Sequence, residues 1–315
     1  MPKGRIKSSK FREYNNEQMH ETVLITGASG LVGRHLTLLL KEKGYRVLSL
    51  GRNPEGEGSF CWDPENEYID TEALNQTDHI VHLAGASIGD MRWSAARKEE
   101  ILSSRVKSCA LLFQKCQEGD IHLKSFISAS AIGFYGNEGS FTEADAAGKG
   151  FLASVCEQWE QAADRFQQAG VRTVKIRTGI VLAADGGVLP QMAKPVRMGL
   201  GTPFGNGKQY LSWIHIMDLC NIYLQAIKNK SWSGVYNAVA PEPLTNRAFT
   251  KELARYFHKP YWPISIPALP IRLALGERSV LLLKGSQVHS SRLKESAFEI
   301  KFPKLSSALS DLYPE

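Results

Sequence analysis

Cysteine is scarce in this sequence, and its spacing excludes two kinds of site. The 315 residues include five cysteines, dispersed and never in a C-x-x-C pair: Cys61, Cys109, Cys116, Cys156 and Cys220. An odd, scattered set argues against a disulfide framework, and the missing pairs argue against a zinc site. We therefore expect no bound metal and a reducing, cytoplasmic environment.

Long apolar runs are also missing. No segment approaches the roughly 18 consecutive apolar residues that a membrane-spanning helix needs. Residues 1–20 contain no apolar stretch of the kind found in a secretory signal, which spans about 7–15 residues. The sequence therefore predicts neither a membrane partner nor export.

Positive charge is in excess, but mostly at one end of the chain. The net charge is +6, and residues 1–20 supply half of it, since they hold five Lys or Arg against two Glu. The remaining excess is spread thinly and is not interleaved with aromatic residues, which argues against a nucleic-acid partner. We expect residues 1–20 to form a basic, disordered, solvated tail; the alternative is a tail that binds nucleic acid.

What the chain does contain is an alternation of short apolar runs and longer helical patterns. Hydrophobic residues make up 43% and charged residues 22%, as in ordinary globular proteins. The strand-like runs are residues 23–25, 46–50, 80–83, 125–129, 174–176, 181–182 and 235–239. This alternation predicts an α/β, Rossmann-type, doubly wound parallel sheet.

The character of the sequence changes after Asp185, where glycines and prolines accumulate. We expect a dinucleotide-binding domain over residues 21–185, to which residues 214–240 return. Residues 186–213 and 241–315 are then expected to form a smaller C-terminal domain that caps the substrate.

Three glycines follow the first strand-like run at the spacing G-x-x-G-x-x-G. Gly27 permits a tight turn, Gly30 lets the backbone approach a pyrophosphate, and Gly33 lets the following helix pack closely. The N-terminus of that helix offers unpaired N–H groups to phosphate oxygens. We expect this loop, including Ser29, Leu31 and Val32, to bind a dinucleotide; the alternative is a structural tight turn.

The residue after the second strand bears on which dinucleotide is bound. An NAD enzyme places a carboxylate about twenty residues beyond the glycines, but this chain reads Gly51-Arg52-Asn53-Pro54. A guanidinium suits a 2′-phosphate through bidentate, charge-assisted hydrogen bonds. Arg52 therefore favours NADP(H), unless it is only an exposed loop arginine.

The run from His79 to Ala86 ends a strand in small residues. The backbone of Leu83, Ala84 and Gly85 is expected to lie beside the adenosine half of the cofactor. His82 lies inside an apolar strand, and we interpret it as a packed core histidine.

Several separated motifs then carry a family resemblance. They are Arg92-Trp93, residues 98–105, 131–136, 159–160, 177–182, 185–187, 205–210 and 213–216, and the segment beyond Ala268 with Gly276-Glu277 and Gln287. With these motifs the chain, from about Val23 on, resembles an extended short-chain dehydrogenase/reductase, and more narrowly the atypical subgroup of epimerase family proteins with a C-terminal domain of unknown function.

The resemblance implies NADP(H) binding, with Glu100 and Arg105 also near the cofactor. The alternative for these two is a surface pair, since they loosely share one helix face. The resemblance further implies a homodimer, which members of this superfamily often form through two long helices.

The pair that usually moves the proton in this superfamily is missing. A tyrosine has an ordinary pKa near 10, which a lysine four residues later lowers. At the expected place the chain reads Phe151-Leu152-Ala153-Ser154-Val155. We therefore predict that Ser130 orients the substrate and that Tyr135, or a water, carries the proton; Tyr135 could instead be a loop aromatic.

Three further residues are predicted to contact the substrate. Lys208 and Gln209 form a polar cluster with Tyr210 that could hold an anionic or hydroxylated compound, or could form a solvated turn. His215 lies between a strand-like run and a helix, where it has either a chemical role or a structural hydrogen bond.

Two functions fit this sequence. The first is an NADP(H)-dependent oxidoreductase or epimerase acting on a small hydroxyl or carbonyl compound, which could be nucleotide-linked. The second is an NADP-binding sensor or protein-interaction module without turnover, suggested by the missing Tyr-Lys pair.

Overall fold

The computed structural model describes residues 21–314, so the expected basic tail, residues 1–20, lies outside the described residues. Its centre is an eight-stranded sheet with the strand order β12-β8-β6-β5-β1-β2-β3-β4. The strands are β1 (Thr22–Thr26), β2 (Arg46–Gly51), β3 (Ser59–Asp63), β4 (Tyr68–Ile69), β5 (His79–His82), β6 (Ser125–Ala131), β8 (Thr173–Thr178) and β12 (Gly234–Ala238). All neighbours pair in parallel except β3 and β4.

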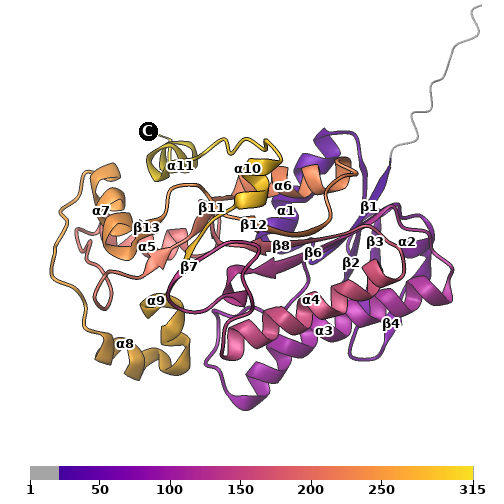
Figure 1. The fold of residues 1–315 in the computed structure, drawn as a ribbon, viewed down its shortest axis with the longest axis horizontal. Helices are drawn as coiled ribbons and strands as arrows, with labels where there is room; N and C mark the ends of the chain where they lie inside the picture. Colours follow the sequence, from indigo (N-terminus) through magenta and orange to yellow (C-terminus); the bar gives the residue numbers. More distant parts are fainter. Residues whose placement is uncertain (1–20, 315) are drawn as a thin grey trace, which may run out of the picture.

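Helices cover both faces of this sheet, which confirms the predicted α/β, doubly wound, Rossmann-type fold (Figure 1). One face carries α1 (Leu31–Glu42) and α6 (Ile216–Lys228), and the other α2 (Thr71–Asn75), α3 (Ala95–Glu118) and α4 (Phe151–Gln168). Successive strand residues alternate between the two cores: Val23 and Ile25 join one, and Leu24 the other. Strands buried on both faces explain the continuous apolar runs in the sequence.

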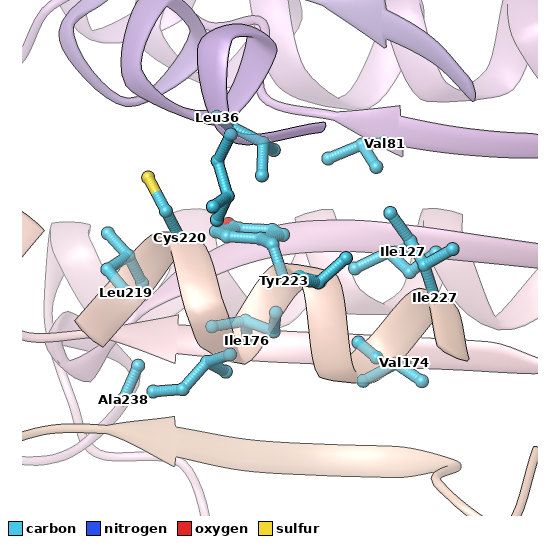
Figure 2. Close-up of a cluster of buried hydrophobic side chains, with 14 of the residues drawn as sticks. Leu36, Val81, Ile127, Val174, Ile176, Leu219, Cys220, Tyr223, Ile227 and Ala238 are labelled. Atoms are coloured by element: carbon cyan, nitrogen blue, oxygen red, sulfur yellow. The ribbon is translucent and has the colours of Figure 1, made fainter. Parts of the chain in front are cut away.

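The core under α6 is close-packed. Figure 2 shows Tyr223 and Ile227 of α6 lying over Ile127, Val174 and Ile176 of the sheet. All five side chains are at most 2% exposed. Burying each such side chain contributes about 1.5–3 kcal/mol, which fixes α6 and the strand ends beside it.

The strand order reverses between β1 and β5, and the region beyond the carboxyl ends of these two strands is called the crevice below. The chain winds from β1 through β2 to β3 on one side, and from β5 through β6 to β8 on the other. In doubly wound sheets, ligands bind at the carboxyl ends of the strands where the winding reverses. The glycine loop after β1 and residues 83–85 after β5 both lie at this point.

Further elements gather at one end of the sheet. They are β7 (Ser140–Phe141), β9 (Ile180–Leu182), α5 (Leu189–Arg197), β10 (Tyr210–Leu211), β11 (Trp213–His215), β13 (Leu244–Thr245), α7 (Asn246–Tyr256), α8 (Ala268–Leu275), α9 (Val280–Leu283), β14 (Gln287–Val288), α10 (Ser291–Glu295) and α11 (Leu305–Leu312). They contain a third core, formed mainly by α5, α7 and α11. A smaller C-terminal region is thus present beside the sheet, as expected.

The end of the chain crosses back to the sheet. Arg292 of α10 donates to the carbonyl of Val235 at 2.7 Å, and Asp218 of α6 accepts from the amides of Lys301 and Phe302 at 2.8 and 3.0 Å. The strand β14 pairs in parallel with β7. The domain boundaries expected from the sequence stay a prediction, because the C-terminal segment contacts both regions.

Among residues 21–314, no helix has both the length and the apolar character to cross a membrane. All five cysteines carry free thiols. Within the same residues, no group of three or more His, Cys, Asp or Glu side chains is arranged to hold a metal ion.

Candidate functional site

The glycine loop has a geometry that side chains would block. Gly27 has φ of +71°, and a Cβ there would lie 3.0 Å from the amide nitrogen of Ala84. A Cβ on Gly33 would lie 2.3 Å from the carbonyl oxygen of Gly27, well inside contact distance. The loop can therefore close against α1 and β5 only with glycine at these positions.

The N-terminus of α1 presents backbone donors beside this loop. Gly30 is the N-cap, no side chain caps it, and the first helical bond runs from Arg34 N to Gly30 O at 2.9 Å. Within the described chain, the amides of Leu31, Val32 and Gly33 have no hydrogen-bond partner. Three unpaired amides at the positive end of a helix dipole fit a pyrophosphate.

Arg52 lies directly after β2, next to this helix end. It is exposed, and no carboxylate of the described residues lies within 4.0 Å of its guanidinium. The side chain is thus available for an anion at the carboxyl end of β2. This position is compatible with the predicted contact to a 2′-phosphate, which stays a prediction.

A buried network holds the other wall of the crevice. Thr26 Oγ1 accepts from the amides of Leu83 and Ala84, both at 3.2 Å, so its own hydrogen points to His82 Nδ1 at 2.8 Å. The proton of His82 is then on Nε2, which lies 3.2 Å from Ser108 Oγ. His82 is a packed core histidine, as interpreted from the sequence, and it orients the backbone of residues 83–84.

This histidine makes the fold sensitive to acid. Burial lowers the pKa of His82 from 6.5 to about 4, and burial lowers that of His215 similarly. Below about pH 6.5 the unfolded chain takes up protons that the folded chain does not. We expect the free energy of unfolding to fall by up to about 1.4 kcal/mol per pH unit for His82 between about pH 6 and 4.5.

Urea unfolding at about pH 7 and about pH 5 measures this dependence. His82→Gln should reduce this dependence without abolishing it, because His215 keeps its own share. His122→Gln, at a side chain that is 89% exposed, should leave the dependence unchanged. A wild-type protein equally stable at both pH values would contradict the prediction.

Arg105 of α3 lies where the crevice meets a cavity. Its guanidinium donates to the carbonyls of Ala86 and Ile101 at 3.0 and 2.8 Å, and a Cβ on Gly85 would lie 2.9 Å from its Cζ. Gly85 therefore leaves room for this arginine. Glu100 points elsewhere and pairs with Arg97 at 2.7 Å, so the structure does not bring Glu100 and Arg105 together as a pair.

The cavity has a volume of about 310 Å³. It lies beyond the carboxyl ends of β6 and β8, between the first turns of α4 and the C-terminal segment around α9. The walls include Arg105 and Tyr135 but not Ser130, Lys208, Gln209 or His215. A concave, largely apolar space next to the crevice can hold the reacting end of a substrate.

Ser130 and Tyr135, the two predicted catalytic residues, belong to one buried network. Ser130 Oγ donates to Glu160 Oε1 at 2.7 Å, and Arg177 bonds both oxygens of Glu160 at 2.7 and 2.9 Å. The phenol of Tyr135 accepts from Arg177 at 2.9 Å and donates to Asn237 Oδ1 at 2.8 Å. Burial raises the pKa of Tyr135, so the phenol stays protonated and committed to Asn237.

The three predicted substrate residues are placed differently from one another. Lys208 is exposed, whereas the buried Gln209 donates to the carbonyls of Phe204 and Leu282 at 3.2 and 2.7 Å. His215 is completely buried and caps α6, since its Nδ1 accepts from Met217 N at 3.1 Å. The structural hydrogen bond left open for His215 is therefore present.

Some residues of the site were not predicted to act there. Glu160 and Arg177 belonged only to the motifs of the resemblance, and their pairing had no signal in the sequence because they lie on α4 and β8. Val280 and Leu281 of α9 line the cavity from the far end of the chain. The position expected for the missing lysine is Val155, a buried cavity residue, while Phe151 packs edge-on against Trp93.

Comparison with known proteins gives, over most of the chain, the family that the sequence resembles. The model of the "NAD dependent epimerase/dehydratase family" matches residues 23–238, and that of a "Domain of unknown function (DUF1731)" matches residues 266–312. An epimerase family protein of Mycobacterium leprae is 37% identical, covering 91% of this chain and 94% of its own. One of Arabidopsis thaliana, named as chloroplastic, is 32% identical, covering 94% and 87%.

Solved structures agree with this. A human epimerase family protein crystallised with NADPH has a TM-score of 0.85 and 31% identity, covering 92% of this chain and 98% of its own. A nucleoside-diphosphate sugar epimerase of Corynebacterium glutamicum has a TM-score of 0.77 and 34% identity, covering 93% and 58%. This chain belongs to the NAD dependent epimerase/dehydratase family and carries that family's Rossmann-type sheet together with a C-terminal domain of unknown function.

Proposed function

We propose that the protein is an NADP(H)-dependent oxidoreductase or epimerase acting on a small hydroxyl or carbonyl compound. The observation that carries this proposal is the position of Arg105, which packs against Gly85 just after β5 and also lines the cavity. A sheet that only bound a nucleotide would not need such a cavity beside the crevice. The family, and the NADPH in the human relative's structure, support a nicotinamide cofactor.

Different residues of the crevice would contact different parts of the cofactor. The amides of residues 31–33 would hold the pyrophosphate, Arg52 the 2′-phosphate, and the backbone of residues 83–85 the adenosine side. The bound cofactor would supply a hydride to a carbonyl carbon or remove one from a carbinol carbon. Arg105, which is partly buried without a carboxylate partner among the described residues, would hold an oxygen of the cofactor or of the substrate.

The chain's own hydroxyl groups would handle the proton. Ser130 and Tyr135 stay candidates, although both hydroxyls have protein partners. Tyr135 could donate only by exchanging its bond to Asn237 for one to the substrate, with Arg177 stabilising the phenolate that results. The alternative donor is water within the cavity, as expected from the missing Tyr-Lys pair.

Arg52→Gln tests the cofactor assignment. A bidentate arginine–phosphate contact contributes about 1.5–3 kcal/mol, so we expect a loss of about 10- to 150-fold in NADPH affinity. NADH lacks the 2′-phosphate, and its affinity should change less than about threefold. Isothermal titration of both cofactors against both proteins measures these values.

Arg46 provides a matched control. It is also an exposed arginine, but it lies at the opposite end of β2 and donates to Gln76. Arg46→Gln should leave both affinities unchanged. Equal binding of NADPH and NADH by the wild-type protein would contradict the assignment to NADP(H). If neither cofactor bound, the proposed function itself would be wrong.

A second function is favoured by the hydrophobic residues at the Tyr-Lys positions. An NADP-binding sensor or interaction module would bind NADPH as tightly as the enzyme but consume none across a panel of carbonyl compounds. Turnover of any of them would favour the enzyme.

A further inference from the structure

The walls of the cavity consist mainly of hydrocarbon. Much of the lining consists of aliphatic side chains and one tryptophan, among them Ile88, Val155, Trp159, Leu211, Val280 and Leu281. Such a surface stabilises apolar groups by about 25 cal/mol per Å² buried. It offers nothing to the several hydroxyl groups of a sugar.

The polar side chains of the lining are mostly bound to the protein itself. Ser212 Oγ donates to the carbonyl of Ser286 at 2.9 Å and accepts from Val288 N at 3.0 Å, and Ser286 Oγ donates to the carbonyl of Gly136. Tyr135 is held by Arg177 and Asn237. Burial raises the pKa of the Cys156 thiol to about 12, so this cavity residue stays neutral.

Some polar side chains of the lining make no hydrogen bond to the described protein. Within the described chain, the buried indole N–H of Trp159 has no acceptor, and the hydroxyl of Tyr210 and the side-chain amide of Asn137 have no partner. The charged side chains of the lining are Arg105 and Lys284, of which Lys284 pairs with Glu138, and no carboxylate residue belongs to the lining. The indole N–H and the Arg105 guanidinium only donate, so they match an oxygen that accepts, such as the carbonyl of an aldehyde or ketone.

The size of the cavity limits the substrate further. Its volume is about 310 Å³. An apolar cavity of about 150 Å³ holds one benzene molecule, so this one has room for about two rings. One of them would be the nicotinamide. The space left surrounds one ring or a short branched chain, and any larger part of a substrate would extend out of the cavity.

The wall opposite α4 comes from the domain of unknown function. Val280 and Leu281 of α9 line the cavity, and no residue of α9 is fully buried. The helix is held by its neighbours: Gln209 donates to the carbonyl of Leu282, and Gly285 donates to the carbonyl of Asn137 at 3.1 Å. The C-terminal domain therefore supplies one wall of the cavity and exposes apolar side chains to its contents.

We infer that the substrate is a small, largely apolar aldehyde or ketone, or the corresponding alcohol, and that Leu281 of the C-terminal domain helps to select it. This inference rests on the proposed function. In the reduction, the carbonyl carbon gains a hydride as NADPH becomes NADP⁺, and the oxygen gains a proton from water. The cavity would then bind its substrate mainly through apolar contacts. It would not use contacts to sugar hydroxyl groups or to a nucleotide.

The experiment uses the full-length protein saturated with NADPH and three probes: benzaldehyde, cyclohexanone and UDP-glucose. We expect the two apolar carbonyl compounds to raise the thermal midpoint and to oxidise NADPH, and UDP-glucose to do neither. Leu281→Asn should weaken the apolar probes by about tenfold or more, because it places an amide in their wall. The NADPH affinity of this variant should fall less than that for the probes, because the proposed phosphate contacts at residues 31–33 and Arg52 lie outside the cavity lining.

Leu273→Asn is the matched control, because Leu273 on α8 is 71% exposed and does not line the cavity. It should change neither the probes' affinity nor that of NADPH. The inference is overturned if UDP-glucose binds more tightly than the carbonyl compounds, if no carbonyl compound binds, or if Leu281→Asn acts like the control. Failure of NADPH itself to bind would instead refute the proposed function.

Discussion

Arg177→Met is expected to lose about 3–5 kcal/mol of folding free energy, because it leaves a buried carboxylate without its charge partner. Arg177 and Glu160 are 4% and 5% exposed, and two hydrogen bonds of 2.7 and 2.9 Å join them. Without the guanidinium, Glu160 keeps only the hydroxyl of Ser130. Urea unfolding followed by circular dichroism measures the loss.

The double variant Glu160→Met with Arg177→Met separates the missing partner from the altered packing. Replacing both members of a buried ion pair by apolar groups is often neutral or stabilising. We therefore expect the double variant to recover most of the stability, while Asn237 still accepts from Tyr135. A loss of less than about 1 kcal/mol in Arg177→Met would show that water or local rearrangement compensates Glu160.

Gly33→Ala should lower NADPH affinity by about tenfold or more, since moving α1 breaks at least one amide–phosphate hydrogen bond, worth about 1.5–3 kcal/mol. The added Cβ would lie 2.3 Å from Gly27 O and 2.6 Å from Ala28 Cα. Both are backbone atoms, so α1 must move away from the loop. Forcing an extra methyl into such a contact should also cost about 1–3 kcal/mol of stability.

Gly89→Ala provides the control, because a Cβ there would meet nothing within 4 Å and its backbone needs no positive φ. It should bind NADPH like the wild-type protein. Titration calorimetry and thermal unfolding measure both effects. If Gly33→Ala bound NADPH normally, the close packing of α1 on the loop would not matter for the cofactor.

The fold and the position of the glycine loop between β1 and α1 could be predicted from the sequence because their signals are local. Alternating apolar runs show the strands, and Gly27, Gly30 and Gly33 lie within one turn between β1 and α1. Arg52 follows the next strand directly. Each of these positions depends on residues near in sequence, so spacing alone indicates its place.

The cavity could not be predicted in the same way, because its walls come from distant parts of the chain. The sequence shows the side-chain chemistry of Ser130, Tyr135 and His215. It does not show their hydrogen-bond partners, which lie far away in the sequence. A tyrosine near the end of β6 can face a substrate or bond Asn237, and only the packed structure decides between them. The apolar residues of the walls, such as Val155 and Leu281, lie on different elements, so no single periodicity in the sequence marks them.

The pairing of β14 with β7 also determines when the cavity can form during synthesis. Loop closure between such distant strands costs entropy, and domains generally fold from the N-terminal side as the chain emerges. The crevice around the glycine loop can therefore assemble on the ribosome while α9 is still unsynthesised. A nascent or truncated chain would bind the dinucleotide before it could enclose a substrate.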